Sequence, residues 1–216
     1  MLRVDGIRVT IKGFIILRGI SLEIPMSGLI ALIGRNGAGK TTTLKSIMGL
    51  IPISDGVIHL DGTDLLQVPG HRRAQLGVGY MPEDRRLIPP LTVEDNIRLP
   101  AWAGRFEKAE ERLAYIYRRM PEVAVLARRR ASTLSGGQQK MVALARALMS
   151  GTKLLLLDEP FEGLSPGLGE RLAETVQGLQ QDGLSVLIAE SDTKRLSFVE
   201  KIYTIERGEI VRETTS

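Results

Sequence analysis

The sequence predicts an α/β fold with parallel strands buried at its centre, and three patterns lead to this prediction. The apolar run Leu29 to Ile33 leads into a glycine-rich loop and then into a helix. The leucine run Leu154 to Leu157 ends in acidic residues, as buried strands do where α/β sheets bind ligands. Helical spacing dominates from about residue 91 to 150, whereas the N-terminal part is rich in strand-forming residues.

The remaining elements follow from local patterns. Strands are expected at Arg3 to Ile11, Ser21 to Ile24 and Val57 to Leu60, and the last of these ends in an Asp61-Gly62 turn. Strands are also expected at 185–189 and 201–206. The strongest helical stretch runs from Phe106 to Met120, with apolar residues spaced along one face.

The loop after Ile33 has the phosphate-binding pattern Gly-x4-Gly-Lys-Ser/Thr. It consists of Gly34, Arg35, Asn36, Gly37, Ala38, Gly39, Lys40, Thr41 and Thr42. Its glycines allow backbone N–H groups to surround phosphate oxygens, Lys40 supplies a positive charge, and the Thr41 hydroxyl is placed to ligate magnesium. The helix that follows directs its N-terminal dipole at the anion. A plain glycine-rich turn is disfavoured because a strand precedes the loop and a helix follows it.

A second motif, Leu-Ser-Gly-Gly-Gln at 134–138, opens a helix that extends to Met149. Ser135 is a good N-cap, and Gly136 and Gly137 leave the first N–H groups of the helix open to an anion. Taken alone, this motif is a common helix cap. It gains weight from the acidic strand end Asp158-Glu159 that follows it closely.

In this order, the phosphate loop, the Leu-Ser-Gly-Gly-Gln motif and the Asp-Glu-Pro strand end resemble the ATP-binding cassette family, over almost the whole chain. The resemblance implies a P-loop NTPase core with an N-terminal antiparallel β-subdomain and an inserted α-helical signature subdomain. It further implies one ATPase domain over 1–216. Residues 1–90 and 151–216 would form the β-subdomain and core, and about 91–150 the helical subdomain.

The family resemblance also implies how ATP is bound. Two such domains enclose two ATP molecules head to tail, so that the signature of one faces the phosphate loop of the other. Ser135, Gly136 and Gly137 would then contact the γ-phosphate of ATP held by a second subunit, either an identical copy or a sister chain. Gln138 would belong to the same nucleotide-binding motif.

The same resemblance assigns the chemistry. Asp158 and Thr41 would hold Mg²⁺ together with Glu83, which stands where the family usually has a glutamine. Glu159 would act as general base on the attacking water. Phosphoryl transfer requires mainly positioning and charge neutralisation from such groups.

The switch position, which many relatives fill with histidine, is Ser191 in this chain. A serine can donate a hydrogen bond but cannot become cationic near neutral pH. The two histidines, His59 and His71, lie outside the motif and are expected at the surface.

The adenine is usually stacked on an aromatic side chain before the phosphate-loop strand. In register, that place falls near Ile11, with Phe14 a few residues on and Ile16 as a possible second packing residue. All three are equally plausible as residues of an edge strand.

Composition narrows the function class. The chain has no cysteine, which excludes disulfides, a thiol nucleophile and cysteine metal sites. No apolar run approaches the ~20 residues of a membrane span. The net charge of +4 and the single Trp give no sign of nucleic-acid binding. The arginine runs are expected on solvated faces, with mild attraction to an anionic membrane surface as the alternative, at 72–73, 85–86, 118–119 and 128–130.

These observations predict an ATP-hydrolysing subunit of a membrane importer. The segment Tyr80 to Arg86 and the segment Glu162 to Pro166 most resemble the branched-chain amino acid importers. The expected partners are a second cassette, transmembrane permease subunits contacted through Arg85 to Trp102, and indirectly an external solute-binding protein. The expected location is the cytoplasmic face of the membrane. An exporter or lipid-extraction ATPase, a soluble cassette protein and a regulatory cassette with weak hydrolysis are the alternatives.

Overall fold

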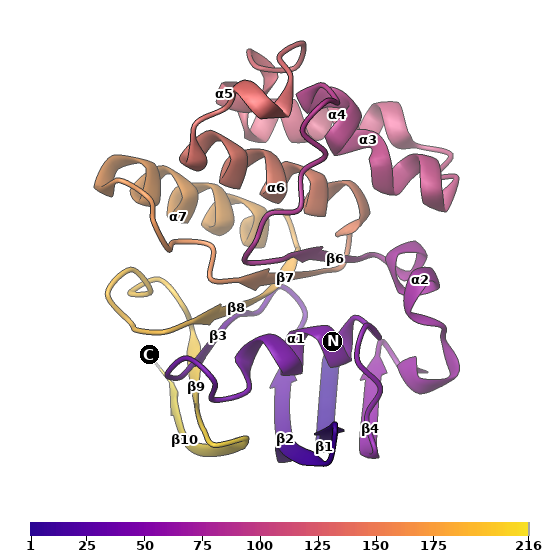
Figure 1. Ribbon diagram of the computed structural model, residues 1–216, viewed down its shortest axis with the longest axis vertical. Coiled ribbons are helices and arrows are strands. Elements are labelled where there is room, and N and C mark those ends of the chain that lie inside the picture. Colours follow the sequence, from indigo (N-terminus) through magenta and orange to yellow (C-terminus); the bar gives the residue numbers. More distant parts are fainter. Residues whose placement is uncertain (216) are drawn as a thin grey trace.

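A computed structural model describes residues 1–215 and shows two sheets with helices between and above them (Figure 1). The larger sheet has six strands in the order β10-β9-β3-β8-β7-β6, and the smaller has four in the order β2-β1-β4-β5. The strands are β1 Leu2–Ile11, β2 Phe14–Ile24, β3 Leu29–Ile33, β4 Asp55–Leu60, β5 Thr63–Asp64, β6 Val78–Met81, β7 Leu154–Asp158, β8 Ser185–Glu190, β9 Lys201–Glu206 and β10 Glu209–Thr215.

The helices form one layer beside the larger sheet and a smaller group between the two sheets. They are α1 Lys40–Ile47, α2 Gly70–Arg73, α3 Val93–Gly104, α4 Ala109–Arg119, α5 Pro121–Ala124, α6 Gly136–Ser150 and α7 Pro166–Gln181. In Figure 1, α6 and α7 lie directly over β6, β7 and β8, with α3, α4 and α5 stacked beyond them, and α1 lies on the opposite side of that sheet.

Five adjacent strands of the larger sheet run parallel, and β10 pairs with β9 in the antiparallel sense. Every residue of β3, β7 and β8 is buried, which the predicted apolar runs require. The register places Ile33 opposite Glu190 and Asp158 opposite Ala189. The loops that leave these three strands therefore begin at the same edge of the sheet.

The N-terminal sheet is antiparallel, as the resemblance implied. Its second strand is Phe14–Ile24, seven residues longer than the predicted Ser21–Ile24, because it pairs with β1 along nearly its whole length. Register shifts within that pairing interrupt the alternation that marks a strand in sequence. The predicted turn is present, since Asp61 and Gly62 have φ of 49° and 81° between β4 and β5.

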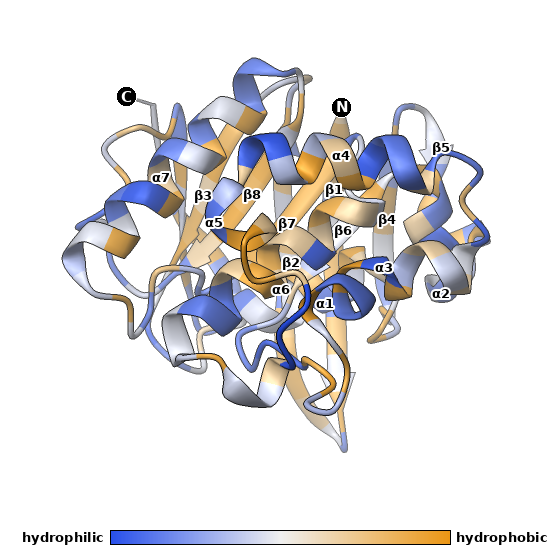
Figure 2. Cartoon of the chain, turned by 90° about the horizontal axis from the view of Figure 1, so that it is seen from above, coloured by the Kyte–Doolittle hydropathy of each residue, from blue (hydrophilic) through white to orange (hydrophobic). Residues whose placement is uncertain are grey.

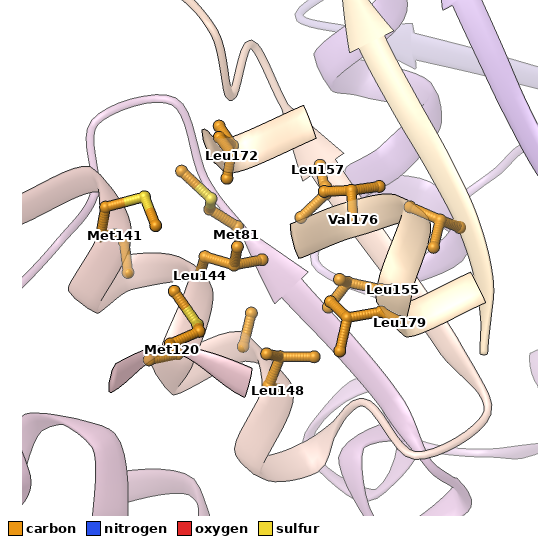
Figure 3. Packing of buried hydrophobic residues seen from close by; sticks show 14 of the residues in the cluster. Met81, Met120, Met141, Leu144, Leu148, Leu155, Leu157, Leu172, Val176 and Leu179 are labelled. Atoms are coloured by element: carbon orange, nitrogen blue, oxygen red, sulfur yellow. The ribbon is translucent and has the colours of Figure 1, made fainter. Parts of the chain in front are cut away.

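The helical layer is held by an apolar core that it shares with the sheet. Figure 3 shows methionine and leucine side chains of α6 facing those of β7 and α7. Helix α3 packs on α6, and both begin with a capping box, Thr92 with Asp95 and Ser135 with Gln138. The predicted face of 106–120 is confirmed, because Leu113, Ile116 and Met120 are buried, although the helix itself starts at Ala109.

The residues of the central strands are more apolar than those on the outer helix surfaces (Figure 2). In Figure 2 the strands at the centre are largely apolar, whereas the outward surfaces of α4 and α7 carry polar residues. Within residues 1–215, no helix combines the length and the apolar character that crossing a bilayer requires.

One of the predicted solvated arginines is not at the surface. Arg73 is only 5% exposed, and its guanidinium donates hydrogen bonds to the carbonyls of Ser46, Ile47 and Val68. The first two of these carbonyls belong to the last turn of α1, where helices leave acceptors unpaired. Arg73 thus caps the helix that follows the phosphate loop, and only its neighbour Arg72 is exposed.

Candidate functional site

Three strand ends bring the predicted site residues together. The phosphate loop leaves β3, the acidic pair lies at the end of β7, and Glu190 and Ser191 lie at the end of β8. A hydrogen bond from Gly34 N to Glu190 O, 3.1 Å, and one from Glu159 N to Ala189 O, 2.9 Å, join the loops to one another. Residues distant in sequence thus form one polar edge, as parallel sheets allow.

Lys40 lies at the centre of this edge and is 4% exposed. Its ammonium donates to Gly34 O at 2.7 Å and to Ser191 Oγ at 3.3 Å, and it lies 3.1 Å from Glu159 Oε1. The Ser191 hydroxyl also lies 3.0 Å from both Glu159 Oε1 and Asn36 Oδ1, so its single proton is shared between two acceptors. The lysine, the acidic residue and the switch residue are in direct contact.

Glu159 adopts a backbone conformation that is rare for a residue with a side chain, with φ at +47°. Such a left-handed residue costs roughly 1–2 kcal/mol and persists only where surrounding contacts fix it. This turn directs the Glu159 side chain towards Lys40, whereas Asp158 beside it stays in the strand.

Asp158 is fully buried and is bonded by two hydroxyls. Thr41 Oγ1 donates to Oδ1 at 2.9 Å, and Tyr80 OH donates to Oδ2 at 3.1 Å. Burial raises the pKa of Asp158, and these two hydrogen bonds oppose the rise. Burial and the neighbouring Asp158 raise the pKa of Tyr80 as well. Tyr80 has no assigned role in the sequence motifs, and only its position at the end of β6 could have indicated it.

A cavity of about 400 Å³ opens over the phosphate loop. Ile16 and Glu83 contribute to its walls, whereas Ile11 and Phe14 do not and lie at the exposed tip of the β1–β2 hairpin. The other walls come from the loop, α1 and the acidic strand end, namely Asn36, Gly37, Gly39, Lys40, Thr41, Thr42 and Glu159.

Glu83 adds negative charge to this cavity. One oxygen of its carboxylate lies within 4.8 Å of one oxygen of Glu159 and one of Glu162, which also lie within 4.8 Å of each other. Burial raises the pKa of Glu83, and repulsion from Glu159 and Asp158 raises it further. A cation near Glu83 would relieve this repulsion.

The loop backbone is shaped for an anion. Gly39, with φ of 116°, ends the loop at the start of α1, and a Cβ there would lie 2.7 Å from Leu17 Cδ2. At Gly34 a Cβ would lie 2.4 Å from the carbonyl oxygen of Ile205. Only glycine therefore fits at these two positions, and the N–H groups of the first turn of α1 remain directed at the cavity.

The signature residues lie apart from this cavity. Ser135 and Gly136 are exposed at the N-terminus of α6, and none of the residues 135–138 lines the phosphate-loop cavity. Gln138 is occupied within its own helix, because its Oε1 accepts from Ser135 N at 3.0 Å while Ser135 Oγ accepts from Gln138 N at 3.3 Å. Ser135 and Gly136 are thus accessible from outside the chain.

His71 is exposed and His59 is half-buried, and neither lines the cavities beside the phosphate loop. Two buried charges near the site, Lys140 and Glu190, and the half-buried Arg146 were not identified from the sequence motifs. Lys140 donates to two backbone carbonyls after β7, and Glu190 accepts from Phe161 N at 2.9 Å. Arg146 donates to the carbonyls of Arg85 and Arg86.

A phosphate loop opening a helix, set against an acidic strand end across a parallel sheet, defines the class of P-loop nucleoside triphosphatases. Comparison with known proteins gives the family. The sequence profile of the ABC transporter family matches residues 17–162. The chain belongs to this family and is an ATP-binding cassette ATPase domain.

The relatives include proteins named for branched-chain amino acid transport and one named for lipopolysaccharide export. The probable branched-chain amino acid transport ATP-binding protein LivF of Archaeoglobus fulgidus is 33% identical to this chain. The match covers 100% of this chain and 92% of that protein. The lipopolysaccharide export system ATP-binding protein LptB of Escherichia coli is 32% identical over 94% of this chain and 86% of its own.

Among solved structures, a dimeric ATP-binding cassette in a post-hydrolysis state with ADP and phosphate matches with a TM-score of 0.89. The match has 26% identity and covers 100% of this chain and 98% of that one. The predicted α/β cassette fold is thereby confirmed.

Proposed function

We propose that this chain is the ATP-hydrolysing subunit of an ABC importer for branched-chain amino acids or related small solutes. The proposed ATPase role rests on the contact of Lys40, Glu159 and Ser191 beside the phosphate loop. The solute class rests on similarity to LivF-type relatives and on the Pro82 to Arg86 segment.

In this proposal the phosphate-loop N–H groups and Lys40 bind the β- and γ-phosphates. Nucleotide binding would draw Lys40 towards phosphate and free the Glu159 carboxylate to accept a proton from the attacking water. Ser191, which bonds both groups, would orient them. A base in this position contributes ~10²- to 10⁴-fold to the rate.

Two oxygen donors in the cavity wall, Thr41 and Glu83, and the buried Asp158 behind Thr41 fit a magnesium ion. The Thr41 hydroxyl and the Asp158 carboxylate already lie 2.9 Å apart, and Glu83 lines the same cavity. These are the hard oxygen ligands that Mg²⁺ takes, and the ion would neutralise phosphate charge during phosphoryl transfer. We propose Thr41, Asp158 and Glu83 as its protein partners.

The exposed signature end of α6 supports a head-to-tail dimer. Ser135, Gly136 and Gly137 have no place in this chain's own cavity, and they would contact the γ-phosphate on a second cassette, with Gln138 fixing their helix end. The dimeric structures among the relatives favour this arrangement.

Transport also requires membrane subunits, and the surface from Arg85 to Trp102 is the proposed contact. It exposes two large apolar side chains, Ile88 at 41% and Trp102 at 53%. Such groups on a surface favour a protein partner. The chain would thus lie peripherally at the cytoplasmic face, bound to permease subunits, with an external solute-binding protein acting through them.

The first experiment is Mg-ATP turnover as a function of protein concentration, with Glu159→Gln as control. We expect specific activity that rises with concentration and falls ~10²- to 10⁴-fold in the variant, which still binds ATP. Turnover that stays negligible at every concentration would instead indicate a required sister subunit or a regulatory cassette. Substantial turnover in Glu159→Gln would exclude Glu159 as the base.

The LptB relative favours a second candidate, an exporter or lipid-extraction ATPase. Reconstitution with the permeases that co-purify from the native membrane separates the two. ATPase activity stimulated by a solute-loaded external binding protein supports the importer, and stimulation by lipid supports the alternative.

A further inference from the structure

The signature helix is joined to the turn that carries Glu159 by one buried lysine. Lys140 lies on α6 and is 2% exposed. Its ammonium donates to Glu159 O at 2.6 Å and to Glu162 O. These two carbonyls are the ends of a single turn, since Glu162 N also donates to Glu159 O at 3.4 Å.

From these contacts we propose that Lys140 is a positioning residue for ATP hydrolysis, which holds the Glu159 turn in its active shape and transmits movements of the signature helix to it. The proposal rests on the proposed role of Glu159 as general base. It goes beyond that role because it assigns a function to a residue outside the nucleotide cavity.

The backbone conformation of Glu159 needs hydrogen bonds that hold it in place. At φ of +47° this residue is in the left-handed region, which a side chain disfavours. Its N–H is fixed by Ala189 O on β8, and its C=O is fixed by Lys140. Without the Lys140 bond, Glu159 O would keep only the longer hydrogen bond from Glu162 N, 3.4 Å. The turn would then hold the carboxylate less firmly towards Lys40 and the phosphate.

The charges around Lys140 favour keeping it cationic at this position. Burial lowers the pKa of the ammonium, and the carboxylates of Glu162, Glu190 and Glu159 offset this lowering only in part, while Arg85 adds to it. A buried charge is tolerated only when hydrogen bonds and opposite charges compensate for its desolvation. Two carbonyls and three nearby carboxylates provide that compensation here.

The position of Lys140 on its helix gives it a signalling role. It lies on the second turn of α6, five residues after Ser135, whose end of the helix would face the partner's ATP. A shift of α6 on engaging that ATP would move the ammonium, and with it the Glu159 turn. One subunit's nucleotide would thus affect the other subunit's catalytic base through a rigid helix.

The test compares ATP hydrolysis and ATP affinity in Lys140→Met, Lys140→Gln and Lys108→Met. Lys108 is an exposed lysine of the same helical layer, with its side chain 81% accessible. We expect kcat to fall about 10- to 100-fold in Lys140→Met with KM for ATP within about twofold, because small misplacements of a catalytic group have effects of this size. The kcat of Lys140→Gln, which retains a hydrogen-bond donor, should lie between the kcat of Lys140→Met and that of the native chain. The kcat of Lys108→Met should equal that of the native chain.

A double variant separates positioning from general loss of structure. If Lys140 acts through Glu159, Lys140→Met should change the residual rate of Glu159→Gln by less than about twofold. A full additional loss in that background, or native kcat in a folded Lys140→Met protein, would overturn the proposal. Failure of Glu159→Gln itself to lower turnover would instead overturn the role of Glu159, so the two failures are distinct.

Discussion

The phosphate end of the cavity and the hairpin tip outside it differ in how firmly their side chains are held. At the phosphate end, Lys40, Glu159 and Asp158 are all buried and hold one another or their neighbours by hydrogen bonds. Outside the cavity, beyond Ile16, the hairpin tip exposes Ile11 at 37% and Phe14 at 74%. In the proposed mode of ATP binding, the phosphates would therefore meet a preorganised site, whereas the adenine would meet an exposed hairpin tip.

The largest effect should come from removing the lysine at the phosphate end. Lys40→Met removes the charge that would pair with the phosphate across the binding site. Loss of one member of a buried charge pair costs about 2–5 kcal/mol, which corresponds to ATP binding weakened ~30-fold or more. Titration with a fluorescent ATP analogue measures this. Affinity unchanged from the native chain would place the triphosphate elsewhere, and Lys108→Met controls for loss of a surface charge.

A second prediction concerns pH and the buried acid behind the phosphate end. Burial raises the pKa of Glu190 to about 7. Its folded pKa then exceeds the unfolded value of about 4.5, so its contribution to stability is full below pH 4.5 and is lost as pH rises to about 7. The loss amounts to about 3 kcal/mol. Glu190→Gln keeps an acceptor for Phe161 N but cannot ionise.

Urea unfolding of both proteins from about pH 4.5 to 8 tests this. We expect the native chain to lose about 3 kcal/mol of unfolding free energy relative to Glu190→Gln across that range. Parallel curves for the two proteins would show that Glu190 ionises as freely in the folded chain as in the unfolded one.

The smallest effect should appear at the hairpin tip. If Phe14 stacks on the adenine, Phe14→Ala should weaken ATP and GTP binding alike by ~1 kcal/mol, about fivefold, because stacking tolerates any base. Stability should change by less than ~0.5 kcal/mol, since the side chain is exposed. Calorimetric titration with both nucleotides measures the effect. Unchanged affinity would leave Ile16 as the residue that packs on the base, and Ile16→Ala is the matched variant.

The same contrast explains what could be predicted from sequence. The phosphate loop and the Asp158-Glu159 strand end are short, contiguous motifs whose chemistry is local, so the order of residues along the chain is enough to identify them. The longer extent of β2 and the burial of Arg73 could not be predicted in this way, because pairing with β1 and the distance to the end of α1 depend on how separate segments pack.

By itself, the sequence determined the cassette fold, the phosphate loop and the acidic strand end, because short motifs of neighbouring residues identify each of them. Only the tertiary structure decided that Lys140, 19 residues before Glu159, fixes the turn of that residue, and that Tyr80 bonds Asp158. Their partners are a backbone carbonyl and a carboxylate brought close by the stacking of α6 on the sheet and by the pairing of β6 with β7. Such contacts form between segments that fold together, and no spacing along one segment encodes them.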